Sequence, residues 1–309
     1  MTRTVITALP RKVGTFLDLI KFVHTVFAMP FALLATVMGL REIHAGWTEK
    51  ATWGRLGLIL LCMVAARTFA MTVNRLVDRR FDAANPRTAR RPSVTGIITP
   101  VVMVLVIGVC AAAFAAGAVA FYVIFGNPWP AILAMPVLLW LGVYSFTKRF
   151  TALCHFWLGI SLGLAPVSAW IAIVPGGGGA VLTLPIVLLG LAVVFWVGGF
   201  DILYALQDEE IDRAAGLQSI PALVGRGRAL WLSRLSHALT IAALVGVGVT
   251  GGFHSFYWAA AGIAAALLVV EQALVRVDDI SRINIAFMTV NGLVGVVVGG
   301  LAITDVVVR

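Results

Sequence analysis

Two acidic segments of this chain share one spacing and could do the same chemistry. Each places three oxygen-bearing side chains four residues apart. The two sets are Asn74, Asp78 and Asp82, and Tyr204, Asp208 and Asp212. Residues four apart lie on one face of a helix. Each segment therefore predicts a ladder of oxygen atoms along one side of a helix that continues past the end of an apolar run.

Two ionisable residues extend these ladders back into the apolar runs. Arg67 lies seven residues before Asn74, and Asp201 lies seven residues before Asp208. An ionisable group inside a bilayer costs at least about 2.5–3.5 kcal/mol on insertion scales, so such groups usually face the interior of a helix bundle. We expect both side chains to point inward, Arg67 toward a substrate or an aspartate partner.

The charges around the ladders fit a magnesium–diphosphate site. Mg²⁺ prefers carboxylate and carbonyl oxygens and usually shares itself between one or two carboxylates and the phosphate oxygens of a substrate. Arginine and lysine then take the remaining phosphate charge. The basic residues predicted on this membrane face are Arg87, Arg90, Arg91, Lys148 and Arg149. The alternative, that the acids only neutralise neighbouring arginines, is disfavoured because the ladder occurs twice.

The elements that hold these residues are predicted to be transmembrane helices. Of the 309 residues, 61% are hydrophobic and only 12% are charged, against roughly 25% charged in soluble domains. Apolar runs of about 20 residues match the thickness of a bilayer, where helices satisfy their own backbone groups. We predict an all-α integral membrane protein, a single domain over 1–309. Its nine spans are placed at about 19–40, 53–77, 101–125, 130–147, 152–174, 181–204, 229–250, 257–275 and 283–304.

The net charge of +9 is interpreted as a topology signal. Arg41, Lys50, Arg55 and Arg309 fall at one set of helix ends, and all the remaining lysines and arginines fall in or toward the other set. The richer set, which includes the N-terminus and both ladders, is predicted to face the cytoplasm. We therefore expect a multi-pass protein of a cell membrane, such as the bacterial inner membrane. The lipid bilayer is its expected partner, and nucleic acid is not.

Other polar residues are predicted to have structural roles. Glu209 and Glu210 lie off the second ladder and are expected in solvent. His155, at the start of a span, is expected to pack. Glu271 and Gln272 are expected to satisfy each other or to reach the membrane surface.

The segments around the ladders resemble the UbiA superfamily of intramembrane aromatic prenyltransferases. The matching segments are NRLVDRRFD, NPRTARRP, YSFTKRFTALCHFWLG and YALQDEEIDR. The stretches KFVHTVFAMPFAL and DDISRINIAFMTVNG also look like the branch that prenylates 4-hydroxybenzoate. The resemblance covers about 17–292, nearly the whole chain.

This resemblance implies nine helices around a central cavity that opens sideways to lipid. It also implies a polyprenyl diphosphate donor, Mg²⁺, and an aromatic acid acceptor that becomes a quinone ring. By position, Asn74, Asp78 and Asp82 match the first metal motif, Asp208 and Asp212 the second, Arg87, Arg91, Tyr144 and Lys148 the diphosphate site, and Arg67 the acceptor carboxylate. Asp201 matches an acid with a supporting or acceptor-binding role.

The implied chemistry follows from charge. Mg²⁺ and arginines stabilise the departing diphosphate while its bond to carbon breaks. The ring carbon ortho to a phenol hydroxyl then attacks the allylic cation, which a dry cavity protects from water. Arg75 and Ser93 depart from the family pattern and leave the acceptor open. 4-Hydroxybenzoate is the leading acceptor, with a naphthoate-type acid as the alternative because NPRTA and FDILYALQD also resemble that branch. A transporter is disfavoured, since transporters place their acids near the membrane centre.

Overall fold

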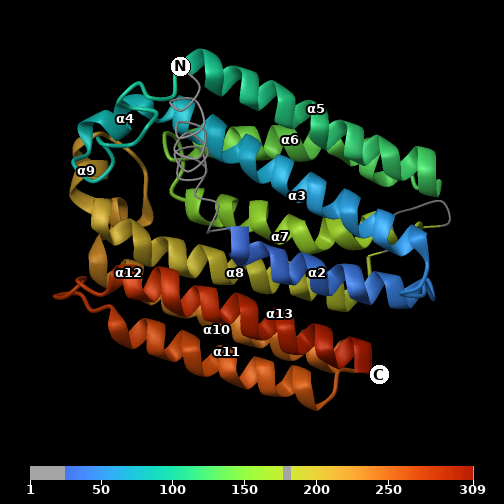
Figure 1. Cartoon of the computed structure of the whole chain (residues 1–309). Helices are drawn as coiled ribbons and strands as arrows, with labels where there is room; N and C mark the ends of the chain where they lie inside the picture. Colours follow the sequence, from blue (N-terminus) through green and yellow to red (C-terminus); the bar gives the residue numbers. More distant parts are fainter. Residues whose placement is uncertain (1–24, 177–181, 309) are drawn as a thin grey trace, which may run out of the picture.

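The computed structural model describes residues 25–176 and 182–308, and this part of the chain is built from helices without a strand. Figure 1 shows the helices running side by side along one direction. The α-helices are α2 (Thr25–Glu42), α3 (Lys50–Val77), α4 (Arg79–Ala84), α5 (Pro100–Phe125), α6 (Trp129–Thr147), α7 (Cys154–Ile173), α8 (Leu184–Ala205), α9 (Glu209–Ala214), α10 (Ile220–Thr250), α11 (Ser255–Leu274), α12 (Ile283–Ile285) and α13 (Asn291–Val308). A 3₁₀ turn (Leu206–Asp208) precedes α9, and a π-helical turn (Ala286–Val290) precedes α13.

The bundle is a multi-pass membrane fold. Eight helical segments of the described residues are long and apolar enough to cross a bilayer, and they coincide with eight of the nine predicted spans. The first predicted span begins outside the described residues, and α2 covers the rest of it. Large apolar side chains cover the outside of α5, where Val101, Val109 and Val123 are 69%, 68% and 74% exposed. Such a surface suits contact with lipid tails rather than water.

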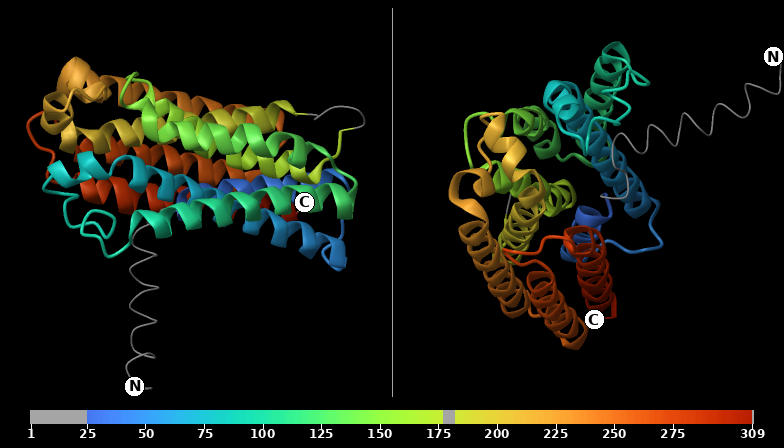
Figure 2. Two further views of the ribbon diagram at one scale, coloured as in Figure 1. Left: turned by 90° about the horizontal axis from the view of Figure 1, so that it is seen from above. Right: turned by 90° about the vertical axis from the view of Figure 1, so that its left-hand side faces the viewer.

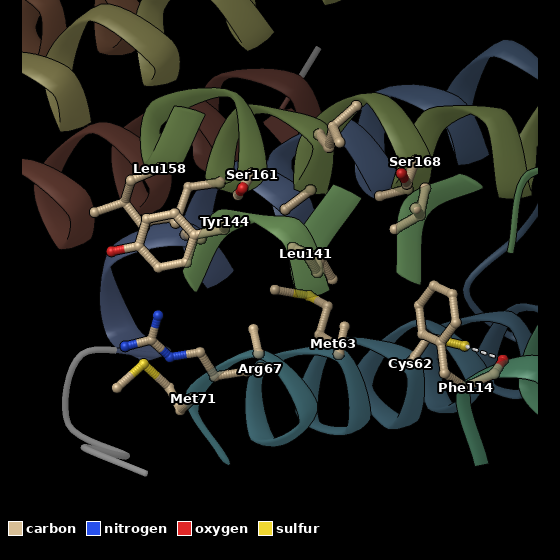
Figure 3. Close-up of a pocket in the computed structure, with 18 of the residues that line it drawn as sticks. Cys62, Met63, Arg67, Met71, Phe114, Leu141, Tyr144, Leu158, Ser161 and Ser168 are labelled. Atoms are coloured by element: carbon tan, nitrogen blue, oxygen red, sulfur yellow. Dashed lines mark hydrogen bonds between the residues drawn. The ribbon is translucent and has the colours of Figure 1, made fainter. Parts of the chain in front are cut away.

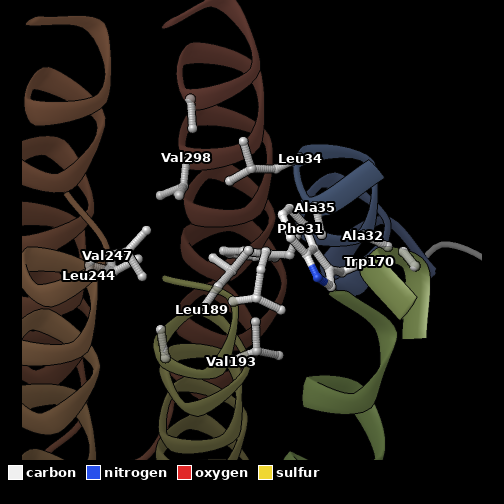
Figure 4. Packing of buried hydrophobic residues seen from close by; sticks show 14 of the residues in the cluster. Phe31, Ala32, Leu34, Ala35, Trp170, Leu189, Val193, Leu244, Val247 and Val298 are labelled. Atoms are coloured by element: carbon white, nitrogen blue, oxygen red, sulfur yellow. The ribbon is translucent and has the colours of Figure 1, made fainter. Parts of the chain in front are cut away.

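Two helices lie at the middle of the bundle. Viewed along its length, α3, α5, α6 and α7 group on one side and α10, α11 and α13 on the other (Figure 2). Between these groups, α8 contacts both α7 and α10, and α2 contacts both α7 and α13. The buried core around them is apolar, with Phe31, Leu189 and Val193 packed together with side chains of α10 and α13 (Figure 4).

Glycines allow α7 and α8 to approach each other closely. A Cβ atom on Gly159 would lie 2.3 Å from the Val194 carbonyl oxygen, and one on Gly163 would lie 2.8 Å from that of Gly190. Only glycine fits at these positions, and small residues are the usual means of close helix packing in membranes. This contact fixes the register of two helices that carry polar residues at one end.

Both acidic ladders are interrupted at that end of the bundle. The α3 helix ends at Val77, and α4 begins at Arg79 after Asp78 takes φ −89° and ψ 3°. The second ladder crosses the 3₁₀ turn between α8 and α9. The prediction that each ladder follows one continuous helix is therefore wrong. The short helices α4 and α9, which follow the two breaks, lie at the same end of the bundle (Figure 1).

Candidate active site

Each of the four ladder aspartates forms an ion pair with a different basic residue. The pairs are Asp78 with Arg149 at 3.4 Å, Asp82 with Arg91 at 2.6 Å, Asp208 with Arg87 at 2.5 Å, and Asp212 with Lys148 at 2.6 Å. Two of the bases come from the loop after α4 and two from the loop between α6 and α7. Each ladder is paired with one base from each of these two loops, so the two ladders and the two loops meet at one place.

The loop after α4 also joins the two ladders directly. Asn85 Nδ2 donates to Asp208 Oδ1 at 2.9 Å, and its own Oδ1 accepts the backbone N–H of Arg87 at 2.9 Å. Arg87 then donates to both oxygens of Asp208 and to the Tyr204 hydroxyl. The buried Asn85 was not predicted from the sequence. The signal available there was an asparagine directly before a proline in the segment NPRTA.

The first ladder has an internal hydrogen bond. Asn74 Nδ2 donates to Asp78 Oδ2 at 2.7 Å, and Arg75 Nη1 donates to Asn74 Oδ1 at 3.1 Å. Burial raises the pKa of Asp78 above its ordinary value, and the nearby negative charge of Asp82 raises it further. A cation bound to this ladder would relieve the repulsion between the two carboxylates.

The bases of the second ladder stay charged. Burial by itself lowers the pKa of Lys148, but the adjoining Asp212 carboxylate outweighs burial and leaves the pKa above its ordinary value. Asp208 has the same effect on the pKa of Arg87. Lys148 and Arg87 are about one-third exposed, so both can reach a ligand outside the pairs. Arg90 is exposed and forms no ion pair within the described ranges.

A cavity of about 350 Å³ extends from this polar end into the bundle. Asn74, Arg91 and Tyr204 line its polar end. Figure 3 shows Arg67 and Tyr144 near one end, with Cys62 and Phe114 at the other. The guanidinium Nε of Arg67 is buried and makes no hydrogen bond to any residue that the structure describes. A buried donor without a partner is costly, so a carboxylate in this cavity would bind there favourably.

The oxygen atoms present fit Mg²⁺ shared with a substrate. Oδ2 of Asp82 is buried and accepts no hydrogen bond from the described part of the chain, which leaves it open to a cation. Within residues 25–176 and 182–308, no three His, Cys, Asp or Glu side chains converge closely enough to hold a metal alone. A site that uses one or two carboxylates and completes its coordination with phosphate oxygens matches this arrangement.

Three of the structural roles predicted for other residues are wrong: those of His155, of Glu209, and of the pair Glu271 and Gln272. His155 does more than pack, because its Nδ1 lies 2.7 Å from Asp201 Oδ2. Glu209 is only 7% exposed and pairs with Arg213 and Arg226, because it turns toward α10 instead of solvent. Glu210 is exposed, as predicted.

Glu271 and Gln272 do not satisfy each other, and Glu271 is buried instead of reaching the membrane surface. Glu271 accepts from Asn291, and Gln272 donates to Ser233 and His237. Both side chains also lie near His237 of α10, because Oε2 of Glu271 is 3.9 Å from Nδ1 of that histidine.

The chain is similar in sequence to known membrane enzymes. The profile of the UbiA prenyltransferase family matches residues 32–293. A 4-hydroxybenzoate octaprenyltransferase of Methylobacillus flagellatus is 31% identical over 279 residues, covering 88% of each chain. One from Paraburkholderia phytofirmans is 32% identical over 252 residues, covering 81% of this chain and 84% of the relative.

Solved structures share the fold. The apo structure of a UbiA homolog from Aeropyrum pernix K1 superposes with a TM-score of 0.78 at 28% identity, covering 91% of this chain and 98% of that one. A UbiA homolog from Archaeoglobus fulgidus, solved bound to GPP and Mg²⁺, has a TM-score of 0.69 at 21% identity, covering 95% and 99%. The second likeness bears on the fold alone.

Proposed function

Because the chain belongs to the UbiA prenyltransferase family, we propose that it transfers a polyprenyl group from polyprenyl diphosphate to 4-hydroxybenzoate in an Mg²⁺-dependent reaction of quinone synthesis. One observation carries this proposal. Four aspartates form ion pairs at one end of the bundle, and Asn74 and Arg91, the partners of Asp78 and Asp82, line a cavity whose interior holds an arginine with an unsatisfied donor. The first feature suits a metal-bound diphosphate, and the second suits an aromatic carboxylate.

Both ladders would hold the metal. Asn74, Asp78 and Asp82 of the first ladder and Asp208 and Asp212 of the second would supply the oxygen ligands. Bound Mg²⁺ would neutralise charge on the diphosphate oxygens as the leaving group departs. This assignment is supported by the open oxygen of Asp82, which accepts no hydrogen bond from the described residues.

The bases would change partners when the substrate binds. Arg87, Arg91 and Lys148 now neutralise carboxylates. With those carboxylates acting as metal ligands, the same cations would be free to bind the phosphate oxygens, Arg with two donors and Lys as a point charge. The cations would then stabilise negative charge that develops as the C–O bond breaks.

The acceptor would lie deeper in the cavity. The Arg67 guanidinium would bind the acceptor carboxylate, and Tyr144 would line the same end of the cavity (Figure 3). This places the aromatic ring between Arg67 and the diphosphate. Relatives named for 4-hydroxybenzoate, similar over more than 80% of the chain, favour that acceptor over a naphthoate-type acid.

The distribution of charge supports an orientation in the membrane. The end that carries α4 and α9 also carries the four ion pairs, and the excess of arginine and lysine predicts the cytoplasmic side. We place the active site there, in a cell membrane such as the bacterial inner membrane. The N-terminus, predicted on the same side, lies outside the described residues.

Transfer assays in membranes test the proposal. Membranes containing the protein are supplied with Mg²⁺, labelled polyprenyl diphosphate, and either 4-hydroxybenzoate or a naphthoate-type acid. We expect label in prenylated 4-hydroxybenzoate, and near-complete loss of product in Asp78→Ala and Asp208→Ala variants that still insert into the membrane. Transfer only to the naphthoate would change the acceptor. Transfer to neither acid would refute the proposed function.

A further inference from the structure

A second kind of acid–base pair lies on the wall of the cavity, apart from the four ion pairs. Asp201 of α8 lines the cavity, and its Oδ2 lies 2.7 Å from Nδ1 of His155 on α7. His155 is 2% exposed, whereas the Asp201 side chain is 23% exposed. The histidine is thus sealed in the protein, and the aspartate is open to the space where substrates would lie.

The hydrogen bonds around His155 define its protonation. The backbone N–H of Ile220, which begins α10, donates to Nε2 of His155 at 3.3 Å. A backbone N–H can only donate, so Nε2 must be the acceptor nitrogen of a neutral imidazole. The proton of the ring is then on Nδ1, where it donates to Asp201 Oδ2. In this arrangement Asp201 is a carboxylate, held in one orientation by its partner.

Asp201 differs from the ladder aspartates because its partner is not an arginine or a lysine. Each ladder aspartate has an arginine or lysine partner. Asp201 has the neutral His155, and its Oδ1 accepts no hydrogen bond from any residue in the described ranges. A carboxylate whose charge is not neutralised and whose second oxygen is free is a stronger proton acceptor than one that is ion-paired.

We propose that Asp201 accepts the phenol proton of the aromatic acceptor, and that His155 is the positioning residue that orients it. This inference rests on the proposed function. Asp201 Oδ1 takes the proton from the phenol hydroxyl, which leaves a phenolate and a neutral carboxylic acid. The phenolate ring carbon forms a bond to the prenyl carbon as the C–O bond breaks and its electron pair leaves on the diphosphate.

The remaining protons are accounted for as follows. The ring carbon that bonded to the prenyl group loses its hydrogen as a proton to the departing diphosphate, and Asp201 returns its proton to the phenol oxygen. The carboxylate is regenerated, and the net product of the cycle is one proton on diphosphate. The proton on Nδ1 of His155 is not transferred, and Nδ1–H remains hydrogen-bonded to Oδ2 of Asp201 throughout.

A positioned base is useful in this cavity because the wall is mostly apolar. A phenol ordinarily has a pKa near 10, and little water is present to take its proton. A phenolate is far more electron-rich than a phenol and attacks the prenyl carbon more readily. A well-placed general base typically contributes 10²–10⁴-fold to a rate.

The test uses full-length protein in membranes and three variants. Asp201→Asn removes the base, and His155→Leu removes its orienting donor. His155→Asn keeps an amide N–H near the position of Nδ1. We expect kcat to fall about 100-fold or more in Asp201→Asn, consistent with loss of a general base. It should fall in His155→Leu as well, and recover substantially in His155→Asn. The KM for polyprenyl diphosphate should stay within about twofold of the wild-type value, because the four ion pairs of the ladder aspartates are intact.

A more acidic acceptor separates a proton-transfer role from a structural one. 3-Fluoro-4-hydroxybenzoate has a more acidic phenol and needs a base less. The turnover ratio of fluorinated to unsubstituted acceptor should therefore rise roughly tenfold in Asp201→Asn relative to wild type. An unchanged ratio, or a full rate in Asp201→Asn, would overturn the inference.

The controls distinguish a failure of the proposed function from a failure of the role proposed for Asp201. If wild type transfers to no aromatic acid, the proposed function fails. If wild type is active and Asp201→Asn behaves the same, only the role of Asp201 fails. Should Asp201→Asn not insert, the same fluorine ratio is measured in His155→Leu, where an unchanged ratio again overturns the inference.

Discussion

Asn85 donates a hydrogen bond to Asp208 across 2.9 Å, although 123 positions separate them in the chain. Oδ1 of the same asparagine accepts the backbone N–H of Arg87. One buried amide therefore orders the loop after α4 and also fixes the second acidic ladder against it. Neither ladder by itself determines the geometry of the site, because this link sets where the two meet.

Replacing Asn85 with alanine should loosen the diphosphate site. The change removes both hydrogen bonds, each worth about 0.5–1.5 kcal/mol. We expect the KM for polyprenyl diphosphate to rise roughly tenfold, with the KM for the aromatic acid nearly unchanged. Asn85→Asp is the informative companion, because it can still accept from Arg87 but places a second carboxylate beside Asp208. Normal diphosphate kinetics in both variants would contradict this role.

Magnesium and diphosphate should bind together. The ladder carboxylates are already neutralised by bases, and no three metal-binding side chains converge among the described residues. In purified protein we expect EDTA or Mg²⁺ alone to change the thermal melting temperature little. Mg²⁺ with a prenyl diphosphate should raise it by several degrees, since a ligand that binds only the folded state stabilises it.

The same measurement carries its own control. Asp78→Ala and Asp208→Ala should lose the combined shift while their melting temperatures without ligand stay measurable. If Mg²⁺ alone gave the whole shift, the carboxylates would be forming a complete metal site, and the need for phosphate oxygens would be wrong.

Arg67 should determine acceptor binding and leave donor binding unchanged. A hydrogen bond to a charged group contributes about 1.5–3 kcal/mol, so Arg67→Leu should raise the KM for 4-hydroxybenzoate by roughly 10- to 150-fold. Arg67→Lys should fall between this variant and wild type. Met63→Leu, one helical turn away on the same cavity wall, is a matched control without a charge. An equal rise in the KM of both substrates would indicate a structural arginine instead.

Much of this architecture could be predicted because membranes constrain sequences strongly. A run of about 20 apolar residues has few other structures available to it, which is why eight predicted spans agree with helices of the structure. The spacing of the acids likewise indicated their chemistry. The basic partners of those acids could not be predicted from the sequence. The pairing of Asp78 with Arg149 or of Asp212 with Lys148 depends on how distant loops fold together.

The errors arose where a helix ends or where two helices meet. Spacing of four residues suggested unbroken ladders, yet the backbone turns at Asp78 and again at Leu206–Asp208. His155 was assigned to packing because nothing near it in sequence suggests a partner. Asp201 becomes that partner only through the glycine-mediated contact of α7 with α8, and a pattern read along one helix does not contain that contact.

Gly159 provides a test of whether this helix contact matters for the site. The Cβ of Gly159→Ala would fall 2.3 Å from the carbonyl oxygen of Val194, so α7 and α8 would have to separate. Overpacking of this kind typically costs 1–3 kcal/mol. We expect a melting temperature several degrees lower than that of the wild type. We also expect a lower turnover, because separation of α7 from α8 moves His155 away from Asp201. Gly300→Ala is the control, because no atom lies within 4 Å of its Cβ position on α13. Alanine favours a helix over glycine, so this control should be neutral or slightly stabilising. Equal behaviour of the two variants would show that the close approach of α7 and α8 does not support the site.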